Sequence, residues 1–127
     1  MSLQRSLSWF TLIGAIAAAV HYVVAVTLEG GLHVAPAWAN VTGFVFAFPV
    51  SYAGHSRLSF AHHAASHRQA LPRFLAIALT GFASNQVLLL SALAWLDWPF
   101  WLVLALVMGI VACLTYLLSR YWAFRAA

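Results

Sequence analysis

The polar residues His21, Asn40 and Asn85 lie inside long apolar stretches of the sequence. An amide or imidazole group that is buried in hydrocarbon without a partner costs several kcal/mol, so we expect these groups to face one another, a backbone carbonyl or water. Such residues either bridge neighbouring helices or line a polar path through the protein, and both readings stay open. For His21 proton coupling is a further reading, because an imidazole binds and releases protons near neutral pH.

A second group of residues carries positive charge at the ends of the apolar stretches. All six cationic residues are arginines, and Arg57, Arg73 and Arg120 each flank an apolar stretch. A guanidinium group pairs with phosphate oxygens in a bidentate manner and is weakly hydrated, which suits a lipid interface. These arginines, together with His55, are candidates for binding a lipid phosphate. The alternative is that they only set the topology and extend toward the headgroups.

Residues that catalysis or metal binding would need are scarce. The only acids, Glu29 and Asp97, lie at the ends of apolar stretches, so general acid–base chemistry has little to work with. The sequence has no nucleophile motif, no paired carboxylates and no glycine-rich phosphate loop. His63 and His67 have the spacing of a helical metal pair, but no Cys, Asp or Glu accompanies them. We therefore expect a non-enzyme without a metal site or a cofactor.

The composition indicates which kind of element positions these residues. Of the 127 residues, 65% are hydrophobic and 6% are charged, whereas soluble domains have about 45–50% apolar and about 25% charged residues. A soluble chain of this size cannot bury so much apolar surface. The composition excludes a soluble enzyme, a disordered chain, a disulfide scaffold and a free nucleic-acid-binding domain, and we expect no nucleic-acid partner. An integral membrane protein with a single domain, residues 1–127, remains.

Four apolar stretches have the length of a membrane-spanning helix, about 20 residues. They cover approximately residues 7–28, 34–54, 74–96 and 99–118. Membrane strands alternate apolar and polar residues, and these stretches do not, so we predict an all-helical, multi-pass four-helix bundle. With four spans, all the arginines fall on one side of the membrane, and Glu29 and Asp97 fall on the other. The positive-inside rule then places both termini and the middle loop in the cytoplasm.

The chain is similar to itself in its two halves. The first half begins at Arg5 and ends with residues 55–60, and the second begins at Arg73 and ends with residues 119–124. Because each half crosses the membrane out and back, we predict two helical hairpins related by a parallel repeat. Small and polar residues form a stripe on each span, which either packs the helices together or lines a polar path. The residues predicted for such a path are His21, Asn40, Ser51, Asn85, Thr115 and Ser119.

Three segments of the sequence resemble the GtrA-like family of small four-helix membrane proteins. They are residues 43–60, 73–85 and 115–124, and the resemblance extends over about residues 5–124. It implies a protein of the bacterial cytoplasmic membrane that takes part in moving a polyprenyl-phosphate-linked sugar across that membrane for cell-surface polysaccharide modification. It also implies membrane glycosyltransferases as partners, one that makes the lipid on the inner face and one that uses it outside.

Three functions stay open on these grounds. A translocase of the sugar lipid needs a polar path, whereas a non-transporting subunit that anchors or assists a glycosyltransferase needs only a docking surface. A proton-coupled exporter of small cations needs an acid within a span, and here only His21 lies inside one. Because side chains fill the middle of a four-helix bundle, we expect a sugar path to form at a lateral groove or between protomers, and we predict a homodimer.

Overall fold

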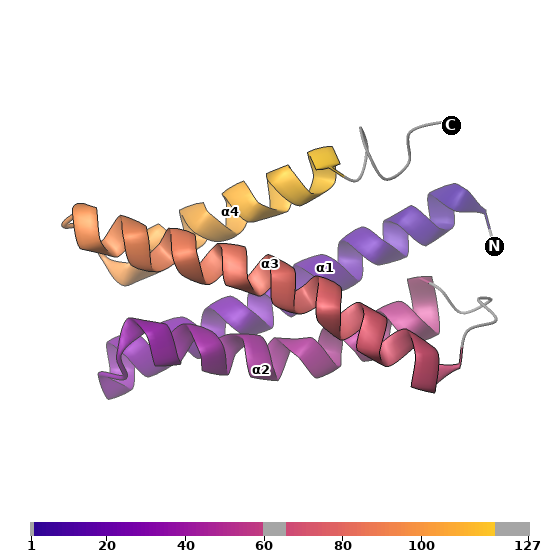
Figure 1. The fold of residues 1–127 in the computed structure, drawn as a ribbon, viewed down its shortest axis with the longest axis horizontal. Helices are drawn as coiled ribbons and strands as arrows, with labels where there is room; N and C mark the ends of the chain where they lie inside the picture. Colours follow the sequence, from indigo (N-terminus) through magenta and orange to yellow (C-terminus); the bar gives the residue numbers. More distant parts are fainter. Residues whose placement is uncertain (1, 60–65, 119–127) are drawn as a thin grey trace.

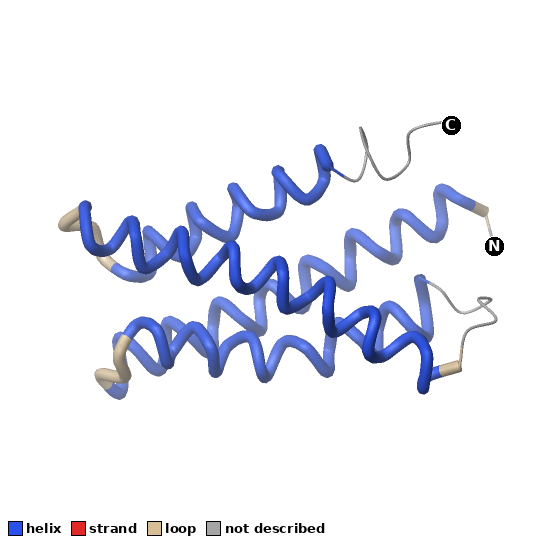
Figure 2. The backbone as a smooth tube through the Cα atoms, in the orientation of Figure 1, coloured by secondary structure: helices blue, strands red, loops and turns tan. Residues whose placement is uncertain are grey.

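The computed structural model describes residues 2–59 and 66–118, and every regular element in these ranges is helical. Figure 2 shows short loops at residues 33–35 and 96–99. The structure confirms the all-helical prediction. Six of the eight helix ends lie within two residues of the predicted span ends, whereas the first helix begins four residues and the third begins seven residues before the predicted span. In chain order the elements are α1 (Leu3–Val26), η1 (Thr27–Gly31), α2 (Pro36–Gly54), η2 (His55–Ser59), α3 (His67–Trp95) and α4 (Phe100–Leu118), where η marks a π-helical turn.

Local sequence signals explain where the first two helices begin and where the chain turns between them. Ser2 caps α1, because its hydroxyl accepts a hydrogen bond from the backbone N–H of Arg5 at 3.3 Å. Pro36 begins α2, at a position where a missing N–H breaks no helical hydrogen bond. Between them, His33 has a φ of 56°, in the left-handed region that reverses the chain direction.

Hydroxyl groups on the outer faces of the helices are paired within their own helix. Thr11 and Thr42 each donate to the carbonyl four residues earlier, at 2.9 and 2.8 Å. Thr80 and Ser84 do the same on α3, at 2.9 and 3.1 Å. This pairing lets an exposed hydroxyl face an apolar environment without an unsatisfied donor.

The helices pair as two antiparallel hairpins, α1 with α2 and α3 with α4, and contacts between α2 and α3 join the hairpins (Figure 1). Both hairpin turns lie at one end of the bundle, and the start of α1, the end of η2, the start of α3 and the end of α4 lie at the other. Arg5, Arg57 and Arg73 therefore share one end, which we call the arginine end, and Glu29 and Asp97 share the other. The cytoplasmic location of the arginine end stays a prediction.

Packing is densest near the turn end of the bundle. Leu89 and Leu104 are completely buried there, together with Ala25 and Ala39. The Tyr22 hydroxyl donates to the backbone carbonyl of Trp101 at 2.9 Å, which joins α1 to α4. Toward the arginine end, the start of α3 and the end of α4 lie far apart (Figure 1). The two hairpins are thus held together most firmly at one end.

Only some of the small residues predicted to pack the helices do so. A Cβ atom at Gly43 would lie 2.6 Å from the backbone oxygen of His21, and one at Gly54 would lie 2.6 Å from Cγ2 of Ile13. These two glycines allow α1 and α2 to approach closely. A Cβ atom at Gly14, Gly81 or Gly109 would meet no atom within 4 Å.

Apolar surface faces outward along the bundle. The side chains of Trp38, Ile77 and Trp95 are 69%, 72% and 88% exposed, which a membrane stabilises and water does not. By length and composition, two helical segments, Leu7–Gly31 and Arg68–Trp95, are able to cross a membrane, and Phe100–Thr115 is apolar but shorter. That α2 and α4 also cross the membrane, which would give the predicted four spans, stays a prediction.

Candidate functional site

His21, Asn40 and Asn85 meet in the interior of the bundle, one from each of α1, α2 and α3. Asn40 is fully buried, and His21 and Asn85 are 8% and 6% exposed. Nε2 of His21 lies 2.7 Å from Oδ1 of Asn40, and Nδ2 of Asn40 donates to Oδ1 of Asn85, also at 2.7 Å. Each of these three side chains thus has a hydrogen-bond partner. This was expected, because burying a polar group without a partner costs several kcal/mol.

Gln86 belongs to the same network, although it was not among the predicted site residues. Nδ2 of Asn40 also donates to Oε1 of Gln86 at 2.8 Å, and Nε2 of Gln86 donates to the backbone carbonyl of Ala37 at 3.2 Å. A signal was available, because an amide in an apolar stretch needs a partner whether it belongs to Asn or to Gln. We call His21, Asn40, Asn85 and Gln86 the amide network.

A groove with a volume of about 260 Å³ lies beside the amide network, and all four helices contribute to its walls. His21, Ser51 and Asn85 border it, while Asn40 lies behind them, away from the lining. Several small side chains of the predicted stripes make the space, among them Ala18, Ala47, Ala78, Gly81 and Ala112. Some members of the predicted stripes thus pack helices, and others border a largely apolar groove that has three polar residues in its lining. The polar path stays a prediction.

Aromatic rings form one wall of the groove and continue toward the arginine end. The rings of Phe44 and Phe82 are stacked, with centroids 4.7 Å apart, and both border the groove. Phe48 also borders the groove, and its ring lies 5.7 Å from that of Phe74. The Phe74 ring in turn lies 5.7 Å from His55, so a column of rings links the groove to the end of α2.

His55 lies within this aromatic column rather than at the surface. It is 5% exposed, and its ring centroid is 4.7 Å from that of Phe10. Loss of hydration on burial lowers the pKa of the His55 imidazole and so disfavours its charged form. Positive charge at this end comes from the arginines.

Of the other predicted site residues, those that the structure describes lie apart from the groove. Arg57 and Arg73 are exposed at the arginine end. Arg57 lies on η2 and Arg73 on α3, and the contact between the rings of His55 and Phe74 joins these two helices. Thr115 is exposed on α4 and is not among the residues that line the groove. Ser119 and Arg120 lie outside the described residues.

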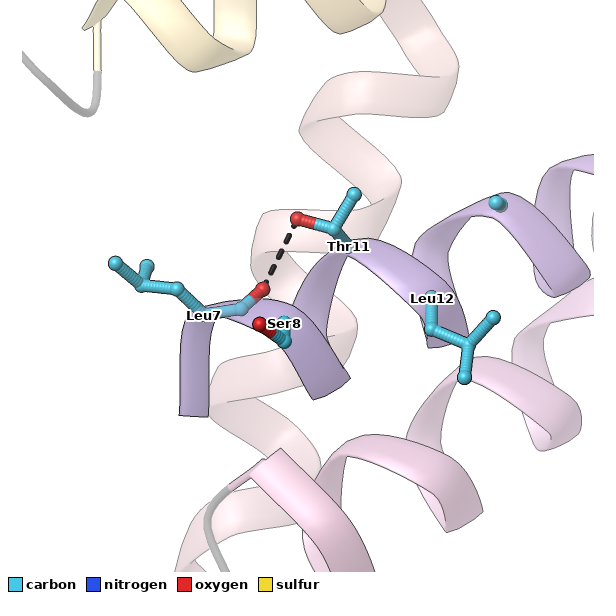
Figure 3. Close-up of a pocket in the computed structure, with 5 residues that line it drawn as sticks. Leu7, Ser8, Thr11 and Leu12 are labelled. Atoms are coloured by element: carbon cyan, nitrogen blue, oxygen red, sulfur yellow. Dashed lines mark hydrogen bonds between the residues drawn. The ribbon is translucent and has the colours of Figure 1, made fainter. Parts of the chain in front are cut away.

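Elsewhere, the described residues offer little chemistry. No group of three His, Cys, Asp or Glu side chains is placed to hold a metal ion in the described part of the chain. A second hollow, on the face of α1, is bordered by Leu7, Ser8, Thr11, Leu12 and Ala15 (Figure 3). Its two hydroxyls already donate to backbone carbonyls of α1, each at 2.9 Å. This hollow therefore presents no donor to a ligand.

Fold and site together define a class: a small helical membrane protein with long apolar helices, an outward-facing apolar surface and a polar network in its interior. Within this class, the chain belongs to the family described as GtrA/DPMS, transmembrane domain, whose family model matches residues 9–124. The resemblance predicted from the sequence motifs is thereby confirmed, and it places the chain among membrane proteins of lipid-linked sugar metabolism. No curated protein and no solved structure matches the chain.

Proposed function

We propose that the protein translocates a polyprenyl-phosphate-linked sugar across the bacterial cytoplasmic membrane, for modification of cell-surface polysaccharides or glycans. The observation that supports this most is the groove bordered by His21, Ser51 and Asn85. At about 1.5 Å per residue, His21 lies about 15 Å from the Gly31 end of its apolar segment and about 21 Å from the Leu7 end. Hydrogen-bonding side chains that border a cavity near the middle of the membrane give a sugar partners as it crosses.

Each part of the substrate has a counterpart in the protein. The phosphodiester is an anion, and Arg57 and Arg73 are exposed cations at one end of the bundle. The sugar enters the groove, while the polyprenyl chain stays in the lipid that covers the apolar outer faces. Arg120 is a third candidate for the phosphate. We place the arginine end in the cytoplasm, where a partner glycosyltransferase makes the lipid.

The groove is small for this task. Its volume of about 260 Å³ is below the range of about 300–1,000 Å³ that is usual for pockets of drug-sized ligands. It is therefore suited to a single sugar rather than an oligosaccharide, and we propose that a second copy of the chain completes the path in a homodimer. The proposal includes no catalytic step. Consumption of the sugar lipid by an outer glycosyltransferase draws the movement in one direction.

The test is transport by the purified protein in lipid vesicles. A polyprenyl-phosphate glucose with a labelled sugar is placed in both leaflets, and the fraction that reaches an enzyme outside the vesicles is measured over time. We expect faster exchange than in empty vesicles, and we expect Asn85→Leu to abolish the gain. Ser84→Leu is the matched control, because Ser84 is exposed on the same helix and bonds only to the Thr80 carbonyl.

Two results would redirect the proposal. Exchange by the wild-type protein no faster than in empty vesicles refutes translocation by this chain alone. If cells that carry Asn40→Leu and Asn85→Leu together still modify their surface sugars normally, the groove has no transport role. The protein is then a non-transporting subunit that anchors or assists the glycosyltransferase.

A further inference from the structure

The hydrogen bonds of the amide network have a fixed donor-to-acceptor direction, from His21 through Asn40 and Gln86 to the backbone carbonyl of Ala37. The direction is fixed because a backbone carbonyl can only accept a hydrogen bond. Nε2 of Gln86 donates to the Ala37 carbonyl, so Oε1 of Gln86 is the atom that faces Asn40 and accepts from its Nδ2. Oδ1 of Asn40 is then the atom 2.7 Å from His21. Since this oxygen only accepts, Nε2 of His21 carries a hydrogen.

This direction decides what the network presents to the groove. A neutral imidazole that donates from Nε2 has an acceptor at Nδ1. Asn85 accepts from Asn40 through Oδ1, so its Nδ2 keeps both hydrogens as a donor. One acceptor on His21 and one donor on Asn85 are thus left over from the network.

The two leftover atoms are not fully buried, and they belong to residues that border the groove. No hydrogen bond joins either atom to another described residue, and the described residues contain no fully buried side-chain nitrogen or oxygen without a partner. Both atoms must therefore be accessible, although their residues are more than nine-tenths buried and border the groove. A Cβ atom at Gly43 would lie 2.7 Å from Cδ2 of His21, so the opposite ring edge, which carries Nδ1, is turned away from α2.

We propose that His21 and Asn85 form a subsite for an uncharged sugar hydroxyl. A hydroxyl group both donates and accepts, so it matches an acceptor beside a donor, as do two neighbouring hydroxyls on one sugar ring. The stacked rings of Phe44 and Phe82 border the same groove and offer an apolar face to the C–H groups of the sugar. This subsite rests on the proposed function and adds a preference among sugars to it.

Charged sugars fit the subsite poorly. The described side chains that border the groove include no Arg, Lys, Asp or Glu. The ammonium group of an amino sugar can donate to His21 Nδ1 and the carboxylate of a sugar acid can accept from Asn85 Nδ2, but neither meets an opposite charge in the groove. Burial of a charge without an opposite charge is far less favourable than burial of a hydroxyl with both its partners. The groove therefore selects neutral, hydroxylated sugars.

Binding measurements test the subsite apart from transport. The probes are polyprenyl phosphates of the same chain length that carry glucose, glucosamine or glucuronic acid, and their binding to the purified full-length protein is measured by native mass spectrometry. We expect the glucose lipid to bind about tenfold more tightly than either charged form, since one poorly matched buried group has an effect of this order.

Substitutions then change the preference in a defined direction. Asn85→Asp keeps the oxygen that accepts from Asn40 and replaces the donor toward the groove by an acidic oxygen, so the glucosamine lipid becomes the tightest of the three. Gly81→Leu fills the groove and weakens all three lipids. Gly109→Leu is the matched control, because a Cβ atom there also meets nothing within 4 Å and Gly109 does not border the groove.

The outcomes separate the subsite from the proposed function. Equal binding of the three lipids by the wild-type protein overturns the subsite, and so does an unchanged order in a folded Asn85→Asp variant. If that variant does not fold, the wild-type order and the Gly81→Leu and Gly109→Leu pair decide the question. Transport of all three sugars without preference rejects the subsite alone. Preferential binding without any transport rejects translocation alone.

Discussion

Gly43→Ala is expected to separate α1 from α2 at the amide network. The added Cβ atom would lie 2.6 Å from the His21 carbonyl oxygen, so one helix must retreat by about 0.8 Å to reach the 3.4 Å at which ordinary contact begins. A retreat of that size along the bond between His21 and Asn40 lengthens it from 2.7 Å to about 3.5 Å, where a hydrogen bond is no longer effective. One methyl group therefore acts on both the packing and the network.

The expected loss of stability has two parts. An overpacked contact costs about 1–3 kcal/mol. A buried polar group left without its partner costs about 1–3 kcal/mol more. Both are large beside a total stability of about 5–15 kcal/mol, so the unfolding temperature should fall by many degrees.

Thermal unfolding in lipid nanodiscs measures this effect, with two matched controls. Gly14→Ala and Gly109→Ala add the same methyl group where no atom lies within 4 Å, so they should leave the unfolding temperature unchanged or raise it slightly. The reasoning is refuted if Gly43→Ala unfolds at the same temperature as these controls.

Three further predictions concern the network, the second close glycine and the topology. Asn40→Leu should destabilise the protein more than Gln86→Leu in the same unfolding assay, because Asn40 bonds to three side chains and Gln86 to one side chain and a carbonyl. Equal losses of stability would contradict the central place of Asn40 in the amide network. Gly54→Ala should cost less than Gly43→Ala, since the three atoms nearest the added Cβ atom belong to the side chain of Ile13 rather than to the backbone. Adding Ile13→Ala, which removes those three atoms, should recover part of the loss; no recovery would place the strain elsewhere. A cysteine introduced as Asp97→Cys should react with a membrane-impermeant thiol reagent outside intact cells, and reaction only after lysis would invert the topology.

The positions of the helices were predictable from the sequence, because an apolar stretch of sufficient length forms a helix whatever its neighbours are. The same holds for the need of His21, Asn40 and Asn85 to find partners, since the free-energy cost of burying an amide or imidazole belongs to the group itself. The pairing into hairpins was also accessible, because short turns between long helices force antiparallel neighbours.

The sequence did not predict which small residues pack against a neighbouring helix and which face open space. Gly43 and Gly81 both lie on stripes of small residues, yet Gly43 touches the backbone of α1 and Gly81 faces open space. Likewise Thr115 belongs to a stripe on α4 but is exposed, away from the groove. Helical periodicity gives the relative angles of side chains within one helix, but it does not give that helix's rotation toward its neighbours.

Composition and charge pattern by themselves determined a helical membrane protein with Arg5, Arg57 and Arg73 at one end, because hydrocarbon burial and charge hydration act on each segment separately. Only the tertiary structure decided that Gln86 joins the network, that the Ala37 carbonyl sets its direction, and that an acceptor on His21 and a donor on Asn85 are left for the groove. These features depend on distances of a few ångströms between residues of three different helices. Such distances come from the packing of the whole bundle, which no single stretch of sequence contains.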